Sequence, residues 1–188
     1  KDQQSMFVDP MCGSGTLPIE AALISADIAP GIYRKYYGFL GWLHHDDKLW
    51  QKLYLNAKFR KQNGLEKKIS IIGYDASAKS ISYAINNLER ADLRGLVHFE
   101  KKDLSDVRPI YQNTIGGLMV INPPYGQRIG ELAEVSQLYV SIGNLVKKYF
   151  QEWKLSILTG NIELGKNIGI HAHKKYQLYN GPIECRLL

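Results

Sequence analysis

The chain has 188 residues, of which 45% are hydrophobic and 22% charged, and its formal net charge is +6 at pH 7. This length suits one domain with a sizeable core, and the composition is that of an ordinary globular protein. No apolar stretch approaches the ~20 residues of a membrane span, and the charged start does not resemble a signal peptide. The positive charge favours an anionic partner such as nucleic acid, although many basic proteins bind none. The two cysteines, Cys12 and Cys185, have no metal-binding spacing and form no disulfide framework, which predicts a cytoplasmic protein.

The first motif combines an apolar run, a glycine loop and an apolar periodic stretch. Met6 to Val8 predicts a strand, and a helix is expected to begin near Thr16. Between them lies Asp9-Pro10-Met11-Cys12-Gly13-Ser14-Gly15. Gly13 and Gly15 would let the backbone approach a ligand, although a tight turn without a ligand is the alternative. Asp9 would repel a pyrophosphate but suits the cationic amino-acid end of S-adenosylmethionine (SAM).

Two nucleotide-binding motifs do not match this loop. The third glycine of the dinucleotide fingerprint is replaced by Pro18, and no Gly-Lys-Ser/Thr of a P-loop follows. A nicotinamide dehydrogenase is therefore disfavoured.

Residues 31–68 interrupt the alternation of strands and helices. The segment holds nine Lys or Arg against three Asp or Glu, interleaved with aromatic residues, and a helix is expected from about Asp47, capped by Asp46 or Asp47. Such residues can hold phosphates and stack bases. The favoured interpretation is that the aromatic side chains pack this helical insertion onto the domain while its basic face is solvated.

No metal site is expected. His44 and His45 are adjacent and point in different directions, which is poor geometry for one metal ion. His171 and His173 would alternate onto one strand face, but the sequence offers no third ligand nearby.

The second and third predicted strands each end in an acidic residue. The second strand, Lys68 to Gly73, precedes Asp75, which could accept both ribose hydroxyls of a nucleoside or could cap the next helix. Ser77 is expected to cap that helix. After the third strand, Leu96 to Glu100, Asp103 could accept an adenine amino group while Leu104 covers the ring.

The fourth strand, Gly117 to Ile121, leads into Asn122-Pro123-Pro124-Tyr125. Two prolines cannot continue a sheet or easily begin a helix, so the chain is expected to leave the sheet as a stiff loop. The Asn122 oxygen and the Pro123 carbonyl could accept hydrogen bonds from one planar amine, and Tyr125 could stack on its ring. A loop in which Asn122 only caps a turn is the alternative.

The remaining chain completes the alternation. Gln127 to Gly130 could touch a substrate backbone. An amphipathic helix over Leu138 to Tyr149 and a strand over Leu155 to Thr159 follow. Lys175 to Leu178 and Ile183 to Leu188 are expected to form a hairpin through Asn180-Gly181.

The elements together predict an α/β fold. Asp9, Asp75, Asp103 and Asn122 follow four successive strands, so they are expected at the carboxyl edge of a doubly wound, mostly parallel, seven-stranded sheet with a terminal antiparallel hairpin. This arrangement resembles the Rossmann-like class I SAM-dependent methyltransferases. In that fold family the Asp-Pro-x-Cys-Gly-Ser-Gly motif holds the methionine end of SAM, and Asn-Pro-Pro-Tyr belongs to enzymes that methylate planar amino nitrogens.

The closer resemblance is to the bacterial 23S rRNA guanine-N2 methyltransferases of the RlmL type. It rests on Asp9 to Leu17, Ile19 to Ala22, Ala26 to Gly31, Gly38 to Trp42, Asn122 to Gly126 and Asn180 to Pro182. The resemblance implies one SAM-dependent catalytic domain over residues 1–188, cut from a longer protein with an upstream THUMP RNA-binding domain. By this resemblance the chain methylates the N2 amine of a guanine in 23S rRNA. A second acid expected near Asp75 is replaced by Ser77.

The resemblance also implies roles for individual residues. Asn122, Pro123 and Tyr125 would hold the target amine and its ring. The following residues would line SAM: Asp9, Cys12, Gly13, Gly15, Asp75, Asp103, Leu104 and Asn122. The same loop occurs in N6-adenine methyltransferases and in enzymes that methylate a glutamine amide, and a non-catalytic RNA-binding module is a further alternative.

Overall fold

The computed structural model describes residues 6–66, 70–110, 116–126 and 132–188. Within these ranges a single sheet has the strand order β3-β2-β1-β4-β5-β7-β6. The strands are β1 (Met6–Asp9), β2 (Ser70–Asp75), β3 (His98–Lys101), β4 (Leu118–Ile121), β5 (Lys154–Thr159), β6 (Tyr176–Asn180) and β7 (Ile183–Leu187). The first five strands run parallel to one another, whereas β7 is antiparallel to both of its neighbours, β5 and β6. The predicted doubly wound sheet with a terminal hairpin is therefore confirmed.

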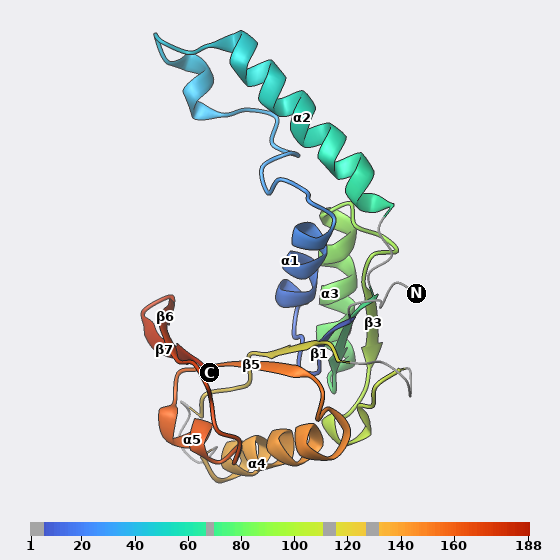
Figure 1. The fold of residues 1–188 in the computed structure, drawn as a ribbon, viewed down its shortest axis with the longest axis vertical. Coiled ribbons are helices and arrows are strands. Elements are labelled where there is room, and N and C mark those ends of the chain that lie inside the picture. The colour runs from blue at the N-terminus through green and yellow to red at the C-terminus, as the bar shows by residue number, and fades with distance from the viewer. Residues whose placement is uncertain (1–5, 67–69, 111–115, 127–131) are drawn as a thin grey trace.

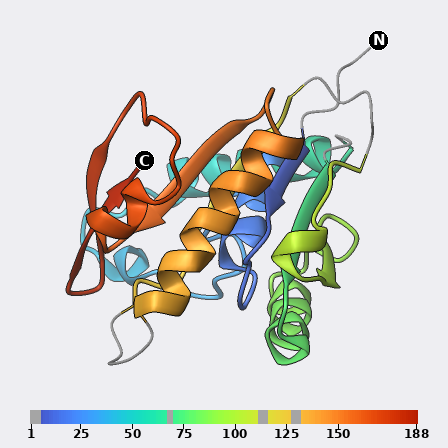
Figure 2. The same ribbon diagram turned by 90° about the horizontal axis from the view of Figure 1, so that it is seen from below.

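Helices cover both faces of the sheet (Figures 1 and 2). The helices α1 (Thr16–Ser25) and α3 (Ala78–Arg90) lie on one face, and α4 (Leu132–Tyr149) and α5 (Ile162–Lys166) lie on the other. Neighbouring residues of β2 show why the strand is continuously apolar: Ile71 packs under α1 and α3, and Ile72 belongs to the core beneath α4. Each face thus has its own apolar core, and the strand ends are fixed between them.

Several element boundaries differ from the sequence-based expectation; among them, α4 begins at Leu132 rather than at Leu138. β3 begins at His98, because Val97 is buried in the core but unpaired in the ladder, and β6 extends to Asn180. The five-residue helix α5 was not expected, because it is too short to show a periodic pattern. Its N-terminus is capped by Asn161, whose Oδ1 accepts a hydrogen bond of 3.2 Å from the Leu164 N–H.

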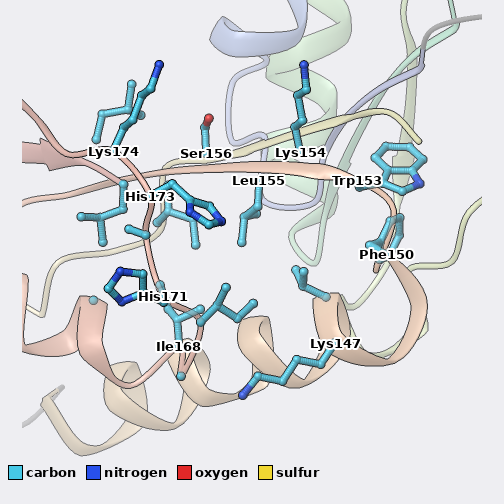
Figure 3. A pocket seen from close by; sticks show the side chains of 18 of the residues that line it. Lys147, Phe150, Trp153, Lys154, Leu155, Ser156, Ile168, His171, His173 and Lys174 are labelled. Atoms are coloured by element: carbon cyan, nitrogen blue, oxygen red, sulfur yellow. The ribbon is translucent and has the colours of Figure 1, made fainter. Parts of the chain in front are cut away.

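A cavity of about 1010 Å³ lies between α4, the first four residues of β5 and the segment after α5 (Figure 3). Its walls are largely apolar, with lysines and two histidines around them. His171 and His173 lie in this segment, outside any strand, with their rings 6.3 Å apart, so the expectation of a shared strand face is wrong. None of Asp9, Asp75, Asp103 or Asn122 lines this cavity. The cavity is therefore separate from the strand ends where the predicted site residues lie.

Residues 33–66, here called the arm, project from the α1 side of the sheet (Figure 1). The arm contains a short 3-10 helix, η1 (Gly38–Gly41), and the long helix α2 (Asp47–Leu65). Asp46 caps α2, since its carboxylate accepts a hydrogen bond of 2.9 Å from the Leu49 N–H.

The arm's aromatic residues pack mainly on one another. The turn at η1 folds Tyr37 and Phe39 back onto Trp50, with ring centroids 4.7 and 5.0 Å apart. Trp42 remains 73% exposed. The expectation that the aromatic residues pack the insertion onto the domain is therefore wrong for most of them, and of these only Tyr54 also touches the core under α1.

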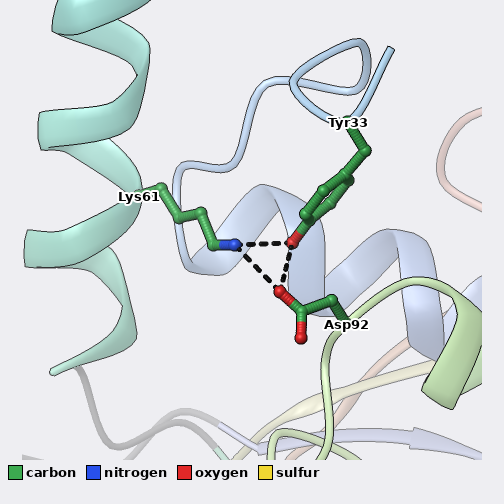
Figure 4. Close-up of polar contacts among 3 residues, drawn as sticks. All are labelled: Tyr33, Lys61 and Asp92. Atoms are coloured by element: carbon green, nitrogen blue, oxygen red, sulfur yellow. Dashed lines mark hydrogen bonds and ion pairs between the residues drawn. The ribbon is translucent and has the colours of Figure 1, made fainter. Parts of the chain in front are cut away.

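Polar contacts instead hold the base of the arm to the domain. The Lys61 Nζ donates hydrogen bonds to the Tyr33 hydroxyl at 2.7 Å and to Asp92 at 3.2 Å (Figure 4). Arg60 forms an ion pair with Asp27. Gly64 allows the backbones to touch, because a Cβ there would lie 1.7 Å from the carbonyl oxygen of Ala26. Three independent contacts thus fix the direction of the arm.

Candidate active site

The predicted site residues follow the carboxyl ends of neighbouring parallel strands. The sheet order places β1 between β2 and β4, with β3 beside β2. Asp9 ends β1 and pairs with Gly73, while Asp75 ends β2, Asp103 comes two residues after β3, and Asn122 directly follows β4. The strand order reverses at β1, and open α/β sheets bind ligands at such a reversal. The fold thus brings these four side chains to one edge.

The glycine loop between β1 and α1 is fixed by backbone hydrogen bonds. The Cys12 N–H donates to the Tyr74 carbonyl at 2.8 Å, and the Gly15 N–H donates to the Cys12 carbonyl at 2.8 Å. Gly13 has φ 55°, and a Cβ there would meet no atom within 4 Å, so space is open beside it. Gly15 has φ 85°, but a Cβ there would lie 2.7 Å from the Phe99 ring. Gly15 is therefore required by packing as well as by conformation, whereas Gly13 faces free space.

Asp9 is almost completely buried, with 1% of its surface exposed. Its Oδ1 accepts a hydrogen bond of 3.0 Å from the Met11 N–H. Burial raises the pKa of the Asp9 carboxyl to about 7, the Met11 bond opposes this, and the neighbouring Asp75 adds to it. A cation arriving at the glycine loop would therefore find a carboxyl that gives up its proton near neutral pH.

Cys12 is buried, and its thiol donates a weak hydrogen bond to the Gly13 carbonyl at 3.8 Å. Burial, together with the charges of Asp9 and Asp75, raises its pKa to about 12. The thiol is therefore protonated at neutral pH and is not a nucleophile. Cys12 is therefore a buried packing residue within the glycine loop.

Asp75 links the glycine loop to the beginning of α3. Its Oδ2 accepts from the Gly13 N–H at 3.0 Å, and its Oδ1 accepts from the Ser77 N–H at 2.8 Å. The Ser77 hydroxyl in turn caps α3, accepting from the Ser80 N–H at 3.2 Å. Ser77, not Asp75, is therefore the cap, and its role explains why this position holds a serine. Each Asp75 oxygen retains a second lone pair for a ligand.

Asp103 and Leu104 differ in exposure. Asp103 is exposed and precedes the 3-10 helix η2 (Leu104–Asp106), whereas Leu104 packs partly against the core beneath α4. This pair therefore offers an exposed carboxylate beside an apolar side chain.

The Asn-Pro-Pro-Tyr loop leaves β4 with Asn122 exposed and Pro123 buried. The Tyr125 hydroxyl donates a hydrogen bond of 2.7 Å to the Asn122 Oδ1. Burial raises the pKa of this hydroxyl to about 12, although the hydrogen bond from Asn180 lowers it. Tyr125 is therefore a hydrogen-bond donor at neutral pH. Gln127 to Gly130, which were expected to touch a substrate, lie outside the described residues.

Two residues at this edge were missed by sequence reasoning as site residues. Gly160 follows β5 beneath the Tyr125 ring, since a Cβ there would lie 2.7 Å from Tyr125 Cδ2. Asn180 ends β6, and its Nδ2 lies 3.4 Å from the Tyr125 hydroxyl oxygen. The Asn180-Gly181 pair signalled a hairpin, but no pattern indicated that the hairpin reaches Tyr125.

The structure contains no group of three His, Cys, Asp or Glu residues placed to hold a metal ion within its described ranges. No helix among the same residues is long and apolar enough to cross a membrane.

Residues 1–188 match the family described as UPF0020, RMKL-like, methyltransferase domain. The chain belongs to this family. It is similar to the ribosomal RNA large subunit methyltransferase K/L of Syntrophotalea carbinolica, with 50% identity over 183 residues, covering 97% of this chain and 26% of that protein. The chain thus spans about a quarter of the length of this curated relative.

Solved structures support the same family. The structure described as SMU.472, a putative methyltransferase complexed with S-adenosylhomocysteine (SAH), has 32% identity and a TM-score of 0.88, covering 100% of this chain and 48% of that one. A Listeria monocytogenes structure described as a predicted N6-adenine-specific DNA methylase has 32% identity and a TM-score of 0.83. The match covers 97% of this chain and 46% of that one. The expected resemblance to RlmL-type enzymes and the fold of a SAM-dependent methyltransferase are therefore confirmed for this RMKL-like domain.

Proposed function

We propose that this domain transfers the methyl group of SAM to the exocyclic N2 amine of a guanine in 23S rRNA. The observation that supports this most is the Asn-Pro-Pro-Tyr loop, which presents the Asn122 amide at the edge where Asp9, Asp75 and Asp103 also lie. The K/L relative is named for ribosomal RNA of the large subunit. We further propose that residues 1–188 form the catalytic domain of a longer cytoplasmic protein with an upstream RNA-binding domain.

The residues at this edge fit SAM. The open space beside Gly13 admits a ligand against the loop backbone, and the buried Asp9 carboxyl suits a nearby ammonium group. The second lone pairs of Asp75 can accept ribose hydroxyls. Asp103 and Leu104 supply the acceptor and the apolar cover that an adenine ring needs. When bound, SAM supplies an electrophilic methyl group on a sulfonium.

The protein's own contribution is to position the target amine. A guanine amine is a poor nucleophile because its lone pair is delocalised into the ring. The Asn122 Oδ1 and the Pro123 carbonyl would accept its two N–H groups, which turns the lone pair toward the methyl group. Positioning of two reactants can supply ~7–11 kcal/mol of a barrier. The methylated amine carries one extra proton, which it loses readily to water, so the reaction requires no strong base. Tyr125 would replace the stacking that the base loses on leaving its helix.

A second candidate is methylation of the N6 amine of adenine. The Listeria monocytogenes structure described with that activity is 32% identical to this chain, and an Asn-Pro-Pro-Tyr loop accepts any planar NH2 group. The guanine assignment is favoured because the RlmL resemblance extends over the insertion and the closing hairpin.

Nucleoside mass spectrometry of 23S rRNA from cells with and without the intact gene tests the proposal. The expected result is loss of one N2-methylguanosine, restored by the gene on a plasmid. An unchanged rRNA profile would contradict the proposal. Loss of N6-methyladenine from DNA or RNA in the same cells would establish the second candidate.

A further inference from the structure

The closing hairpin reaches into the Asn-Pro-Pro-Tyr loop. Asn180 pairs with Ile183, so it is the last residue of β6 before the two-residue turn. Its amide nitrogen lies 3.4 Å from the Tyr125 hydroxyl oxygen. The Tyr125 ring also lies against Gly160, where a Cβ would be 2.7 Å from the ring and 3.0 Å from the Ile183 side chain. The hairpin and Gly160 together fix the position of the Tyr125 ring.

The hydrogen bonds through Tyr125 have a defined direction. The amide nitrogen of Asn180 can only donate, so the Tyr125 oxygen accepts from it. The single proton of the hydroxyl is then donated to the Asn122 Oδ1 at 2.7 Å. If the Asn122 amide turned over, its NH2 group would face the hydroxyl and the hydroxyl proton would lose this acceptor. Successive hydrogen bonds of this kind also strengthen one another.

This direction matters for the target amine. The Asn122 Oδ1 has two lone pairs, so it can accept from Tyr125 and from an incoming amine together. If the Asn122 amide were reversed, its NH2 group would face the NH2 group of the target, and the two hydrogen-bond donors would repel. An exposed asparagine is otherwise free to adopt either orientation.

We propose that Asn180 is a positioning residue for methyl transfer, which acts through the Tyr125 hydroxyl to hold the Asn122 amide with its oxygen toward the target amine. The proposal rests on the proposed function, because it assigns Asn122 to the target amine. It adds a role for the hairpin, which acts on the Asn-Pro-Pro-Tyr loop through the contact between Asn180 and Tyr125.

The test uses the full-length protein, SAM and 23S rRNA from cells that lack the gene. Asn180→Asp exchanges the donor for an acceptor, so Tyr125 would donate to residue 180 and release Asn122. We expect kcat to fall roughly tenfold, as for one lost hydrogen bond, while the Kd for SAM stays within about twofold. Because Asn180 is exposed, the substitution leaves the core intact, which thermal unfolding verifies.

Gln177→Glu is the matched control. Gln177 lies on the same strand, and its amide nitrogen is 3.3 Å from the Tyr179 hydroxyl. The substitution therefore makes the same amide-to-carboxylate change beside a tyrosine, with the same added charge, but away from Tyr125. We expect it to retain kcat, and an equal loss in both variants would overturn the role of Asn180.

A double-mutant cycle separates this role from a structural one. Tyr125→Phe removes the hydroxyl, so in that background Asn180→Asp should change kcat no further. The same fold-loss with and without the hydroxyl would overturn the proposal. The unsubstituted protein is measured first: no transfer to rRNA overturns the proposed function itself, whereas normal transfer with an unaffected Asn180→Asp variant overturns only the role of Asn180.

Discussion

The site residues already have hydrogen-bond partners in the protein. Asp75 accepts two backbone N–H groups, Asp9 accepts one, and the Asn122 oxygen accepts the Tyr125 hydroxyl. These partners fix the orientation of each acceptor while leaving further lone pairs for ligands. The residues thus require little rearrangement to bind, which reduces the cost of binding.

Asn122→Ala is expected to abolish most methyl transfer. The substitution removes one acceptor for the amine, and loss of one preorganised group of this kind typically lowers kcat by about 10²–10³-fold. The Kd for SAM should change little. Methyl transfer to rRNA and SAM binding by calorimetry measure the two effects separately, and equal loss of both would contradict the assigned role.

The raised pKa of the Asp9 carboxyl predicts that the stability of the protein depends on pH. Its pKa is raised from 3.8 to about 7 on folding, so between these values the folded state holds a proton that the unfolded chain releases. The free energy of unfolding should therefore fall as pH rises from about 4 to about 7, by roughly 4 kcal/mol at most. Asp9→Asn should remove this slope, because an amide does not titrate. Urea unfolding of both proteins over this pH range measures it, and parallel curves would show that Asp9 is ionised throughout.

At the scale of elements, the glycine loop and the arm depend on close backbone approach. The loop between β1 and α1 needs Gly15 to pass the Phe99 ring, and α2 needs Gly64 to touch Ala26. Both contacts join segments that are distant in sequence. The sequence around each glycine gives no indication of the residue that it contacts in the fold.

Gly64→Ala is expected to displace the arm. A Cβ at this position would lie 1.7 Å from the Ala26 carbonyl oxygen, and overpacking of this kind costs about 1–3 kcal/mol. Limited proteolysis within α2 and urea unfolding measure the effect. Gly38→Ala in η1 is the control, because a Cβ there meets nothing within 4 Å. Equal sensitivity of the two variants would show that the contact with Ala26 is unimportant.

At the scale of the whole molecule, both cysteines report on global unfolding. Cys12 and Cys185 are free and buried, with 7% and 1% of their surfaces exposed. They lie in different parts of the fold: Cys12 is in the glycine loop between β1 and α1, and Cys185 is in β7. Reagents should therefore reach them only when the fold opens.

Thiol labelling is expected to slow when SAM is added. A ligand that binds only the folded state at 100 times its Kd stabilises it by about 2.7 kcal/mol, which is about a 100-fold lower open population. Both cysteines should be protected to a similar extent, as measured by mass spectrometry of labelled peptides. Protection of Cys12 alone would indicate local shielding by the ligand, and protection of neither would contradict SAM binding.

The sequence by itself determined the sheet, the strand-end motifs and the family. Continuous apolar runs that end in Asp9, Asp75 or Asn122 are local signals. A parallel strand that is buried on both faces does not alternate apolar and polar residues, and the polar residue marks the point where the chain leaves the sheet. The hairpin was also predicted from a local signal, because an Asn-Gly pair favours the two-residue turn that joins antiparallel strands. Tertiary structure alone decided contacts between distant segments. It placed Asn180 and Gly160 around Tyr125, showed that Gly15 makes room for Phe99, and turned the arm's aromatic residues onto one another. These contacts depend on how separate elements pack against one another. A short stretch of sequence does not indicate which distant side chain will contact it in the folded protein.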